Sequence, residues 1–391
     1  MLRLVSAVIA LVVALFAGMW LGGHSHVLPD GLQELVADDD VAQIDDALAK
    51  VEDDFYREVR DEELTDNAIR GAVRGLGDRF SFYLNPKENE QFRERTHARF
   101  SGIGVTVTQV EEGLRIGQVY EKSPAEKAGL RVGDVITAAD GESLAGKQEE
   151  AATGRVKGPK GTVVTLTIKR GKRTFEERVE RAEISIPVVS SRRYGDIAYL
   201  RLEAFSSGAH AELYKRLRDA ERDDVKGIVF DLRANPGGLV DEARLVASAF
   251  LPDGEIVTTR GRAVDEVVYR ATGEPLAPKT PLVVLVDRAS ASASEIVAGA
   301  LQDRGRARLV GTRTFGKGVF QSVIQLDNGG ALDLTVGQYF LPSGRNLGGK
   351  GTARGDGTAP GAGLQPDVEV SDDPDTRRDE ALRRALRVLG G

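Results

Sequence analysis

The chain has 391 residues, and its 53 Lys and Arg against 60 Asp and Glu give a formal net charge of −7. This balance, with no basic run interleaved with aromatic residues, argues against a nucleic-acid-binding protein. The absence of cysteine excludes a thiol nucleophile, a disulfide and a thiolate metal site. With 41% hydrophobic and 29% charged residues, and a length beyond what one core usually organises, we expect a folded protein of two or three domains.

The amino terminus has the composition of an export segment. From Leu4 to Leu21 it carries no charge, and Ser6 is its one polar residue, so at about 1.5 Å per residue it approaches the length of a bilayer span. We expect residues 1–22 to be a signal peptide or a signal anchor, and the bulky apolar residues up to Leu21 favour the uncleaved anchor. The short stretch before this apolar segment carries Arg3, and positive charge favours the cytoplasmic side of a membrane segment. We therefore expect the rest of the chain to lie outside the cytoplasm.

Residues 30–97 are predicted to be a helical region, because apolar residues recur there at about one helical turn. They are Val41, Ile44, Leu48 and Val51 in a first segment and Leu64, Ile69, Val73 and Leu76 in a second.

From Phe100 the pattern changes to short strands and turns. The strings FSGIGV (100–105) and SPAEKAGLRVGDVI (123–136) resemble a PDZ domain of the bacterial processing-protease type, covering residues 98–182. The resemblance implies that the loop and strand of Gly102, Ile103, Gly104 and Val105 bind a peptide tail, with free amides for its carboxylate and a strand edge for its backbone. Two features depart from that family: the groove helix, about 148–155, is rich in alanine, and Lys157 stands where arginine is common.

Beyond residue 183 predicted strands alternate with helices. The buried strands 228–232 and 282–286 are each followed by a turn and a helix, 241–250 and 293–303, and a hairpin follows with strands 319–326 and 331–336. We therefore expect a multidomain α+β protein whose peptidase core, residues 183–345, is a crotonase-like α/β fold. Residues 346–391 form the last segment, with a Gly-rich loop at 348–363 that has no Walker pattern and an amphipathic helix at 376–389 that packs on the protein or on a second subunit.

The first string with a chemical meaning is DLRANPGG (231–238). Pro236 restricts the turn, and Gly237 with Gly238 lets backbone amides point at a bound group, as an oxyanion hole requires. A sharp turn ordered by an Asp231–Arg233 ion pair is the alternative interpretation.

The second string, SASASEIVAGALQD (290–303), places Ser292 at the start of a helix, where the amide of Ala293 has no intrahelical acceptor. A serine at this position is more often a simple helix cap, and Ser290 or Ser294 could fill either role. Glu295, one turn into the helix, is expected to stabilise the helix start.

The third string, FGKGVFQ (315–321), contains Lys317, which must be neutral to act as a base. The ordinary pKa of lysine is about 10.4, but desolvation by neighbouring apolar side chains lowers it. Gln321, four residues on along a strand, can hold the amine through its amide oxygen. A surface lysine beside a glycine turn, or a base drawn from His97 or His210, are the alternatives.

Together these strings resemble the carboxy-terminal processing peptidases, also called tail-specific proteases. The resemblance covers nearly the whole chain and rests on YREVRDEELTDNAIRGAV (56–73), the PDZ strings, DLRANPGG, SASASEIVAGALQD, GTRTFGKGVFQ (311–321), YFLPSGR (339–345) and LQPDVEV (364–370). It implies that Ser292 is the nucleophile, Lys317 the general base and Gln321 the residue that orients it. It also implies an oxyanion hole made by the amides of Ala293, Gly237 and Gly238.

The implied reaction is peptide hydrolysis through an acyl-enzyme, with no metal and no cofactor. The implied partners are proteins with free carboxy-terminal tails, an adaptor or activator protein and a second copy of the chain, in the periplasm or cell envelope of a bacterium, with membrane attachment through residues 4–21. Tail binding is expected to reposition the PDZ domain and complete the Lys317 site. Two alternatives stay open: a catalytically silent membrane-anchored PDZ scaffold, and acyl-thioester chemistry, for which no nucleotide cradle is recognisable.

Overall fold

The computed structural model describes residues 39–97, 99–348, 361–371 and 378–390. The chain divides into two compact units, Met1–Gly77 and Asp78–Gly391. The predicted membrane segment 4–21 and most of the Gly-rich loop lie outside the described residues. Among the residues that are described, no helix is both long enough and apolar enough to cross a membrane.

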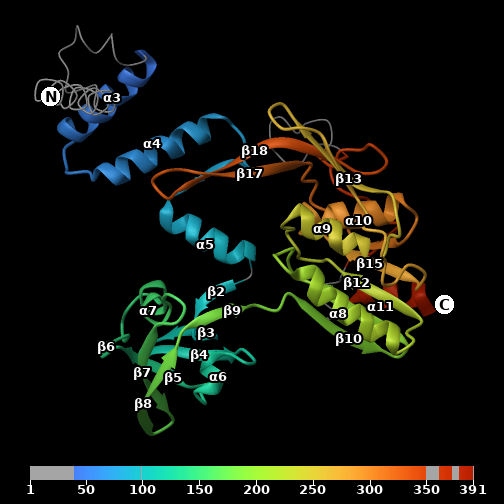
Figure 1. Cartoon of the computed structure of the whole chain (residues 1–391), viewed down its shortest axis with the longest axis horizontal. Coiled ribbons are helices and arrows are strands. Elements are labelled where there is room, and N and C mark those ends of the chain that lie inside the picture. The colour runs from blue at the N-terminus through green and yellow to red at the C-terminus, as the bar shows by residue number, and fades with distance from the viewer. Residues whose placement is uncertain (1–38, 98, 349–360, 372–377, 391) are drawn as a thin grey trace, which may run out of the picture. The chain divides into compact units, whose positions relative to one another are not determined.

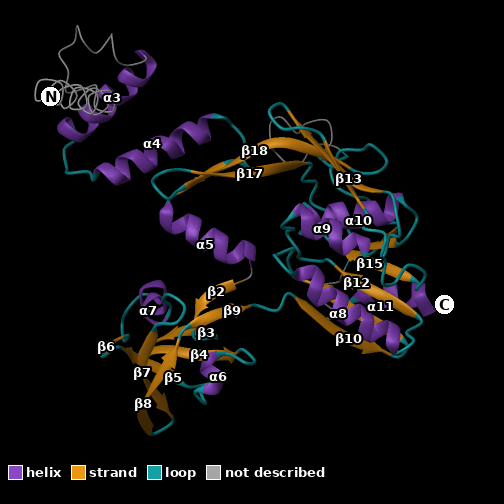
Figure 2. Cartoon of the chain, in the orientation of Figure 1, coloured by secondary structure: helices purple, strands orange, loops and turns teal. Residues whose placement is uncertain are grey.

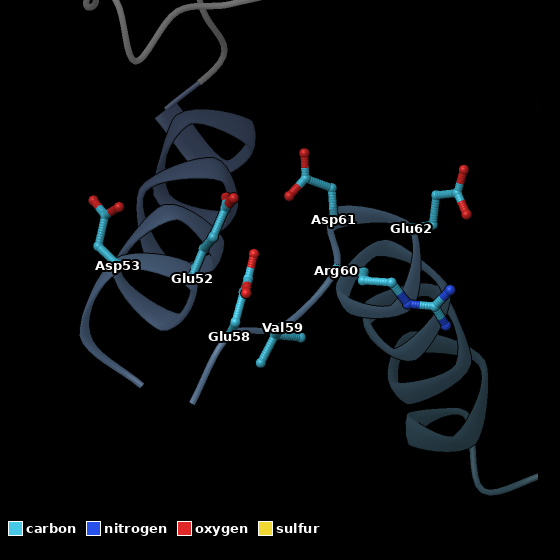
Figure 3. A pocket seen from close by; sticks show the side chains of 7 residues that line it. All are labelled: Glu52, Asp53, Glu58, Val59, Arg60, Asp61 and Glu62. Carbon is cyan, nitrogen blue, oxygen red and sulfur yellow. The ribbon is translucent and has the colours of Figure 1, made fainter. Parts of the chain in front are cut away.

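The first unit contains α3 (Asp39–Asp54) and α4 (Asp61–Gly75), which correspond to the two predicted helical segments (Figure 1). The apolar residues that predicted α3 are largely uncovered, since Val41 and Ile44 are each 60% exposed. A hollow lies between the end of α3 and the start of α4 (Figure 3), and the seven residues that line it are Glu52, Asp53, Glu58, Val59, Arg60, Asp61 and Glu62. This lining offers no nucleophile, and no cluster fit to hold a metal ion exists in the described part of the chain.

The second unit begins with β1 (Phe82–Leu84) and α5 (Pro86–His97), after which the chain forms a small β-domain. Its sheet has the order β3-β4-β5-β7-β8, with β6 beside β5, while β2 pairs with β9. The elements are β2 (Arg99–Gly102), β3 (Val105–Val110), β4 (Gly113–Val119), α6 (Pro124–Lys127), β5 (Val135–Ala139), β6 (Glu142–Ser143), α7 (Glu149–Val156), β7 (Val163–Arg170), β8 (Arg173–Glu180) and β9 (Ala182–Ser185).

This β-domain has its own hydrophobic core, in which Leu114, Ile136 and Leu166 are fully buried. The predicted helix after the Ser123–Pro124 pair is α6, and the Ser123 hydroxyl accepts the Glu126 amide at 3.1 Å as its N-cap. In the described sheet β3 pairs only with β4, so its other edge carries unpaired backbone groups.

After the β-domain the chain forms a six-stranded sheet in the order β10-β11-β12-β15-β16-β19. All its pairs are parallel except β10 with β11. The strands are β10 (Val189–Tyr194), β11 (Ile197–Leu202), β12 (Gly227–Asp231), β15 (Leu282–Val286), β16 (Arg308–Gly311) and β19 (Val368–Glu369), and the helices are α8 (Ala209–Arg222), α9 (Val240–Ser248), α10 (Ala293–Asp303) and α11 (Glu380–Gly390). Figure 2 shows the mixture of helix and sheet that the sequence predicts.

The two faces of this sheet are covered by different helices. Ile228 and Phe230 of β12 pack with α8, α9 and α10, whereas Val229 packs on the opposite face with Ala381 and Ala385 of α11. This alternation is the period-two pattern of a strand buried on both sides. The predicted carboxy-terminal helix therefore packs on its own chain, and the structure starts it at Glu380, later than the predicted 376.

A second sheet has the order β1-β18-β13-β14, with β17 also paired to β18. Its remaining strands are β13 (Glu255–Gly261), β14 (Val267–Arg270), β17 (Val319–Gln325) and β18 (Ala331–Phe340). The predicted hairpin corresponds to β17 and β18, but β18 runs past the predicted end at residue 336. It continues because residues Gly337 to Phe340 pair with β13.

Candidate active site

Ser292 lies at the junction between β15 and α10, with an unusual backbone conformation. Its φ of +54° and ψ of −116° fall outside the regions that side-chain-bearing residues normally adopt. A strained turn from strand to helix is a known way to expose a nucleophilic serine. The Ser292 side chain is only half-buried.

The neighbouring serines are engaged differently. Ser290 donates its hydroxyl to the Leu232 carbonyl at 2.8 Å, and Ser294 donates to the Asn235 carbonyl at 2.9 Å. Both side chains are fully buried. Of the three serines that the sequence left as alternatives, Ser290 and Ser294 therefore fasten the start of α10 to the DLRANPGG loop, and Ser292 remains accessible.

The Gly237–Gly238 turn lies in close contact with the β15–α10 junction that carries Ser292. A Cβ atom added at Gly237, whose φ is +103°, would lie 2.7 Å from the Ala291 carbonyl oxygen, 2.8 Å from Ser292 Cβ and 2.9 Å from Ala293 N. A Cβ at Gly238 would lie 2.4 Å from the Phe205 carbonyl oxygen. Both positions require glycine because the backbones approach too closely for any side chain.

The three amides predicted to form an oxyanion hole are not equivalent. Gly237 N donates to Asn235 Oδ1 at 2.9 Å, so this amide is occupied. Within the described chain no hydrogen bond is found for the amides of Gly238 or Ala293. The unpaired amides therefore belong to Ala293, the residue after Ser292, and to Gly238, the residue after Gly237, while Gly237 itself makes the close approach to Ser292.

A buried polar network fixes the other end of the DLRANPGG loop. Arg233 Nη2 donates to Asp231 Oδ2 at 2.7 Å, and its two Nη atoms bind both oxygens of Asp379, just before α11, at 2.8 Å. Tyr199 donates its hydroxyl to Asp231 at 2.7 Å, and burial together with the Asp231 charge raises the pKa of Tyr199 to about 12. The ordering ion pair considered from the sequence is present, so it coexists with the glycine turn.

Lys317 lies in the loop between β16 and β17, and its amine is held by Gln321. Lys317 Nζ donates to Gln321 Oε1 at 2.6 Å, while Gln321 Nε2 donates to Thr335 Oγ1 at 3.0 Å. The second bond fixes the orientation of the amide, so its oxygen faces the lysine. The structure therefore brings together the two residues that the sequence paired.

Burial lowers the pKa of Lys317 below its ordinary value, the direction that a general base requires. Part of the cover comes from Phe80, whose ring centroid lies 5.0 Å from Nζ. The carboxylates of Asp333, Asp78 and Glu295 oppose this effect by raising the pKa.

Glu295 does more than stabilise the start of α10. Its side chain is fully buried, and Oε2 accepts the amides of Ser292 at 2.9 Å and Lys317 at 3.0 Å. Oε1 accepts Gly316 N at 2.8 Å and the Thr314 hydroxyl. Burial raises the pKa of Glu295, and these four hydrogen bonds oppose the rise. One carboxylate thus joins the serine junction to the lysine loop.

Tyr339 is a second residue whose place the sequence did not predict. Its buried hydroxyl donates to the Lys317 carbonyl, and its side chain also bonds with that of Ser292. Burial raises the pKa of Tyr339 well above its ordinary value. The signal in the sequence was the YFLPSGR string, which carries no spacing relation to Ser292 or Lys317.

The predicted tail-binding residues lie at the start of the exposed edge of β3. Gly102 ends β2 and Val105 begins β3, while the carbonyls of Ile103 and Gly104 accept the amides of Ala125 at 2.8 Å and Tyr120 at 3.0 Å. Gly104 has a φ of +84°, and a Cβ there would lie 2.3 Å from Ser123 Cβ. Within the described residues the amides of Ile103 and Gly104 have no partner. Lys157 Nζ pairs with Glu94 at 2.8 Å.

Comparison with known proteins identifies both parts. Residues 196–370 match peptidase family S41, and residues 115–170 match a PDZ domain. A carboxy-terminal-processing protease of Bartonella bacilliformis is 39% identical over 318 residues, which cover 80% of this chain and 73% of that protein. A Staphylococcus saprophyticus protein named "Probable CtpA-like serine protease" is 33% identical over 80% of this chain and 64% of its own length.

A solved structure of the photosystem II D1 C-terminal processing protease is 28% identical, with a TM-score of 0.48, covering 90% of this chain and 92% of that one.

Proposed function

Because this chain belongs to peptidase family S41, the carboxy-terminal-processing serine proteases with a PDZ domain, we propose that it is an endopeptidase using Ser292 and Lys317. The observation that carries this proposal is the shared carboxylate of Glu295, which accepts the amides of both residues. The lowered pKa of Lys317 and its hydrogen bond to Gln321 support the role of general base.

In the proposed reaction the Lys317 amine takes the proton from the Ser292 hydroxyl, and the Ser292 oxygen bonds to the carbonyl carbon of the peptide. The amides of Gly238 and Ala293 hold the negative oxygen of the tetrahedral intermediate. Its collapse breaks the peptide bond, and the leaving amine takes the proton from Lys317. Water then hydrolyses the ester on Ser292, with Lys317 again as base. Gly237 is proposed to let the loop approach Ser292, since its own amide is occupied.

Substrates are proposed to be proteins with a free, flexible carboxy-terminal tail. The unpaired amides of Ile103 and Gly104 suit a terminal carboxylate, and the open edge of β3 suits an added peptide strand. Tail binding is proposed to reposition the PDZ domain and complete the Lys317 site, with or without an adaptor protein.

From the sequence we propose residues 1–22 as an export segment, 30–97 as a helical region, 98–182 as a PDZ domain, 183–345 as the peptidase core and 346–391 as a terminal segment. The helical region is interrupted by the strand β1. The parallel sheet between α11 and the helices α8, α9 and α10 supports a crotonase-like core. The matched ranges 115–170 and 196–370 support the separation of PDZ domain and peptidase core.

The proposed location is the cell envelope of a bacterium, with residues 4–21 as an inner-membrane anchor; the bacterial processing proteases that this chain matches support it. A homo-oligomer is proposed because α3 leaves Val41 and Ile44 uncovered. Light scattering of the full chain beside a variant with both residues changed to Ser tests this, and an unchanged mass would reject α3 as the interface.

The test of function is cleavage of an unstructured protein by purified protein, beside Ser292→Ala and Lys317→Ala. We expect cleavage by the wild type alone, and mass spectrometry of the products locates the cut sites. Equal absence of cleavage in all three would favour the silent scaffold. The acyl-thioester alternative predicts binding of a coenzyme A ester, which calorimetry detects.

A further inference from the structure

A buried carboxylate without a partner lies on the hairpin that carries Gln321. Asp333, on β18, is only 7% exposed and pairs in register with Val323 of β17. Thr335, two residues after Asp333 on β18, pairs with Gln321 of β17. Opposed residues of antiparallel strands have side chains on one face, and positions two apart share that face. Asp333 therefore lies on the same hairpin face as Gln321, which holds the Lys317 amine.

Within the described chain the Asp333 carboxylate makes no hydrogen bond and no ion pair, although the backbone of Asp333 is paired in the sheet. Burial raises the pKa of Asp333, and the charge of Lys317 lowers it. In return, Asp333 raises the pKa of Lys317 more than Asp78 or Glu295 does. Burying an ionised carboxylate is unfavourable in free energy unless a positive charge lies nearby. For Asp333 that positive charge is Lys317, which stabilises its ionised form.

The other charged groups around Lys317 already have structural roles. Asp78 accepts the Ser81 hydroxyl at 2.6 Å and the Phe80 amide at 3.2 Å. Glu295 accepts four hydrogen bonds from the serine junction and the lysine loop. Arg79 lies over the Phe80 ring at 4.6 Å. Asp333 is the carboxylate of this group that holds no part of the fold in place.

We propose that Asp333 is a positioning residue of the reaction, whose carboxylate is the counter-charge for the Lys317 ammonium that forms when the amine takes the Ser292 proton. This inference rests on the proposed Ser-Lys mechanism. The Ser292 O–H bond breaks, the N–H bond forms on Lys317, and no proton moves to Asp333. The negative charge favours the charged form of the lysine, so it makes Lys317 a stronger base.

The test is Asp333→Asn, which removes the charge and costs no existing hydrogen bond. From the pH dependence of kcat/KM for an unstructured protein, we expect the acid limb to move to lower pH by about one unit. The plateau above it falls about three-fold, because a weaker base transfers the proton less readily. Asp327→Asn, an exposed position in the turn of the same hairpin, should change neither value, and Asp333→Glu should restore the wild-type limb.

A second measurement follows the amine without turnover. In full-length Ser292→Ala protein, labelling of Lys317 by an amine-reactive reagent at several pH values, quantified by peptide mass spectrometry, gives the midpoint of its deprotonation. Adding Asp333→Asn should lower that midpoint, with thermal melting confirming that both proteins are folded. An unchanged midpoint in folded protein would overturn the inference and leave the protease assignment standing. If the wild type cleaves nothing at any pH, the proposed function fails, and the labelling still decides the charge coupling.

Discussion

Glu295 Oε2 accepts the backbone amide of Lys317 at 3.0 Å, although Glu295 belongs to α10 and Lys317 to the loop that enters β17. The same oxygen accepts the amide of Ser292 at 2.9 Å. A displacement of either segment would break one of these bonds and leave a buried charge short of donors. The carboxylate therefore fixes the separation between Ser292 and Lys317, the proposed nucleophile and base, through their backbones and independently of their side chains.

Glu295→Gln should separate this positioning role from simple helix stabilisation. The amide NH₂ group would face backbone N–H donors, so we expect about 1–3 kcal/mol loss in the free energy of unfolding. Cleavage should fall about 100-fold because the two segments shift relative to each other. Denaturant unfolding and product formation measure the two effects. The matched control is Asp241→Asn in the first turn of α9. Because the Asp241 side chain is exposed, we expect this variant to keep wild-type activity. Wild-type activity in Glu295→Gln would contradict the role.

The three serines of the SASAS string should respond differently to alanine. Ser292→Ala is expected to abolish cleavage and leave the melting temperature unchanged. Ser290→Ala and Ser294→Ala each remove one of the two donors to a buried carbonyl, which keeps its bond from a backbone amide. About 1 kcal/mol of stability should therefore be lost, with cleavage retained after correction for folded fraction. Loss of cleavage in a fully folded Ser294→Ala protein would reopen the choice of nucleophile.

The proposed role of Lys317 as base predicts a definite pH dependence of cleavage. Since burial places its pKa below the ordinary value, cleavage should rise with pH to a plateau, with a midpoint below that of an exposed lysine. The unfolded chain binds more protons between the two pKa values, so the contribution of this residue to stability increases as pH rises through that window.

Lys317→Arg keeps the positive charge but removes the base, because a guanidinium stays protonated at every accessible pH. We expect a folded protein without cleavage from pH 6 to about 10. Lys226→Arg, an exposed ion-paired lysine, is the matched control and should be fully active. Substantial cleavage by Lys317→Arg would exclude a lysine base.

Local patterns predicted the elements of the core well, and α10 has the predicted bounds 293–303 because its apolar spacing and its cap position agree. The relations between distant segments were less accessible. Glu295 fits a helix-start role by its spacing alone, and only the fold shows that Lys317 reaches the same oxygen. The cover from Phe80 comes from the turn before β1, and the charge of Asp333 comes from β18; no periodicity assigns either to the site. The occupied amide of Gly237 depends on the rotamer of Asn235, which a sequence does not specify.

Gly237→Ala tests whether the close approach of the glycine turn to Ser292 matters for catalysis. The added Cβ would meet two backbone atoms and Ser292 Cβ within 3 Å, so the turn must move away from the serine junction. Its φ of +103° adds strain of about 1–3 kcal/mol. Gly273→Ala is the matched control, because Gly273 has a φ of +89° and nothing within 4 Å of the added atom. Both variants should lose stability in thermal unfolding, and only Gly237→Ala should lose cleavage, by about 100-fold through the displaced amide of Gly238. Equal activity in the two folded variants would show that the turn takes no part in holding the oxyanion.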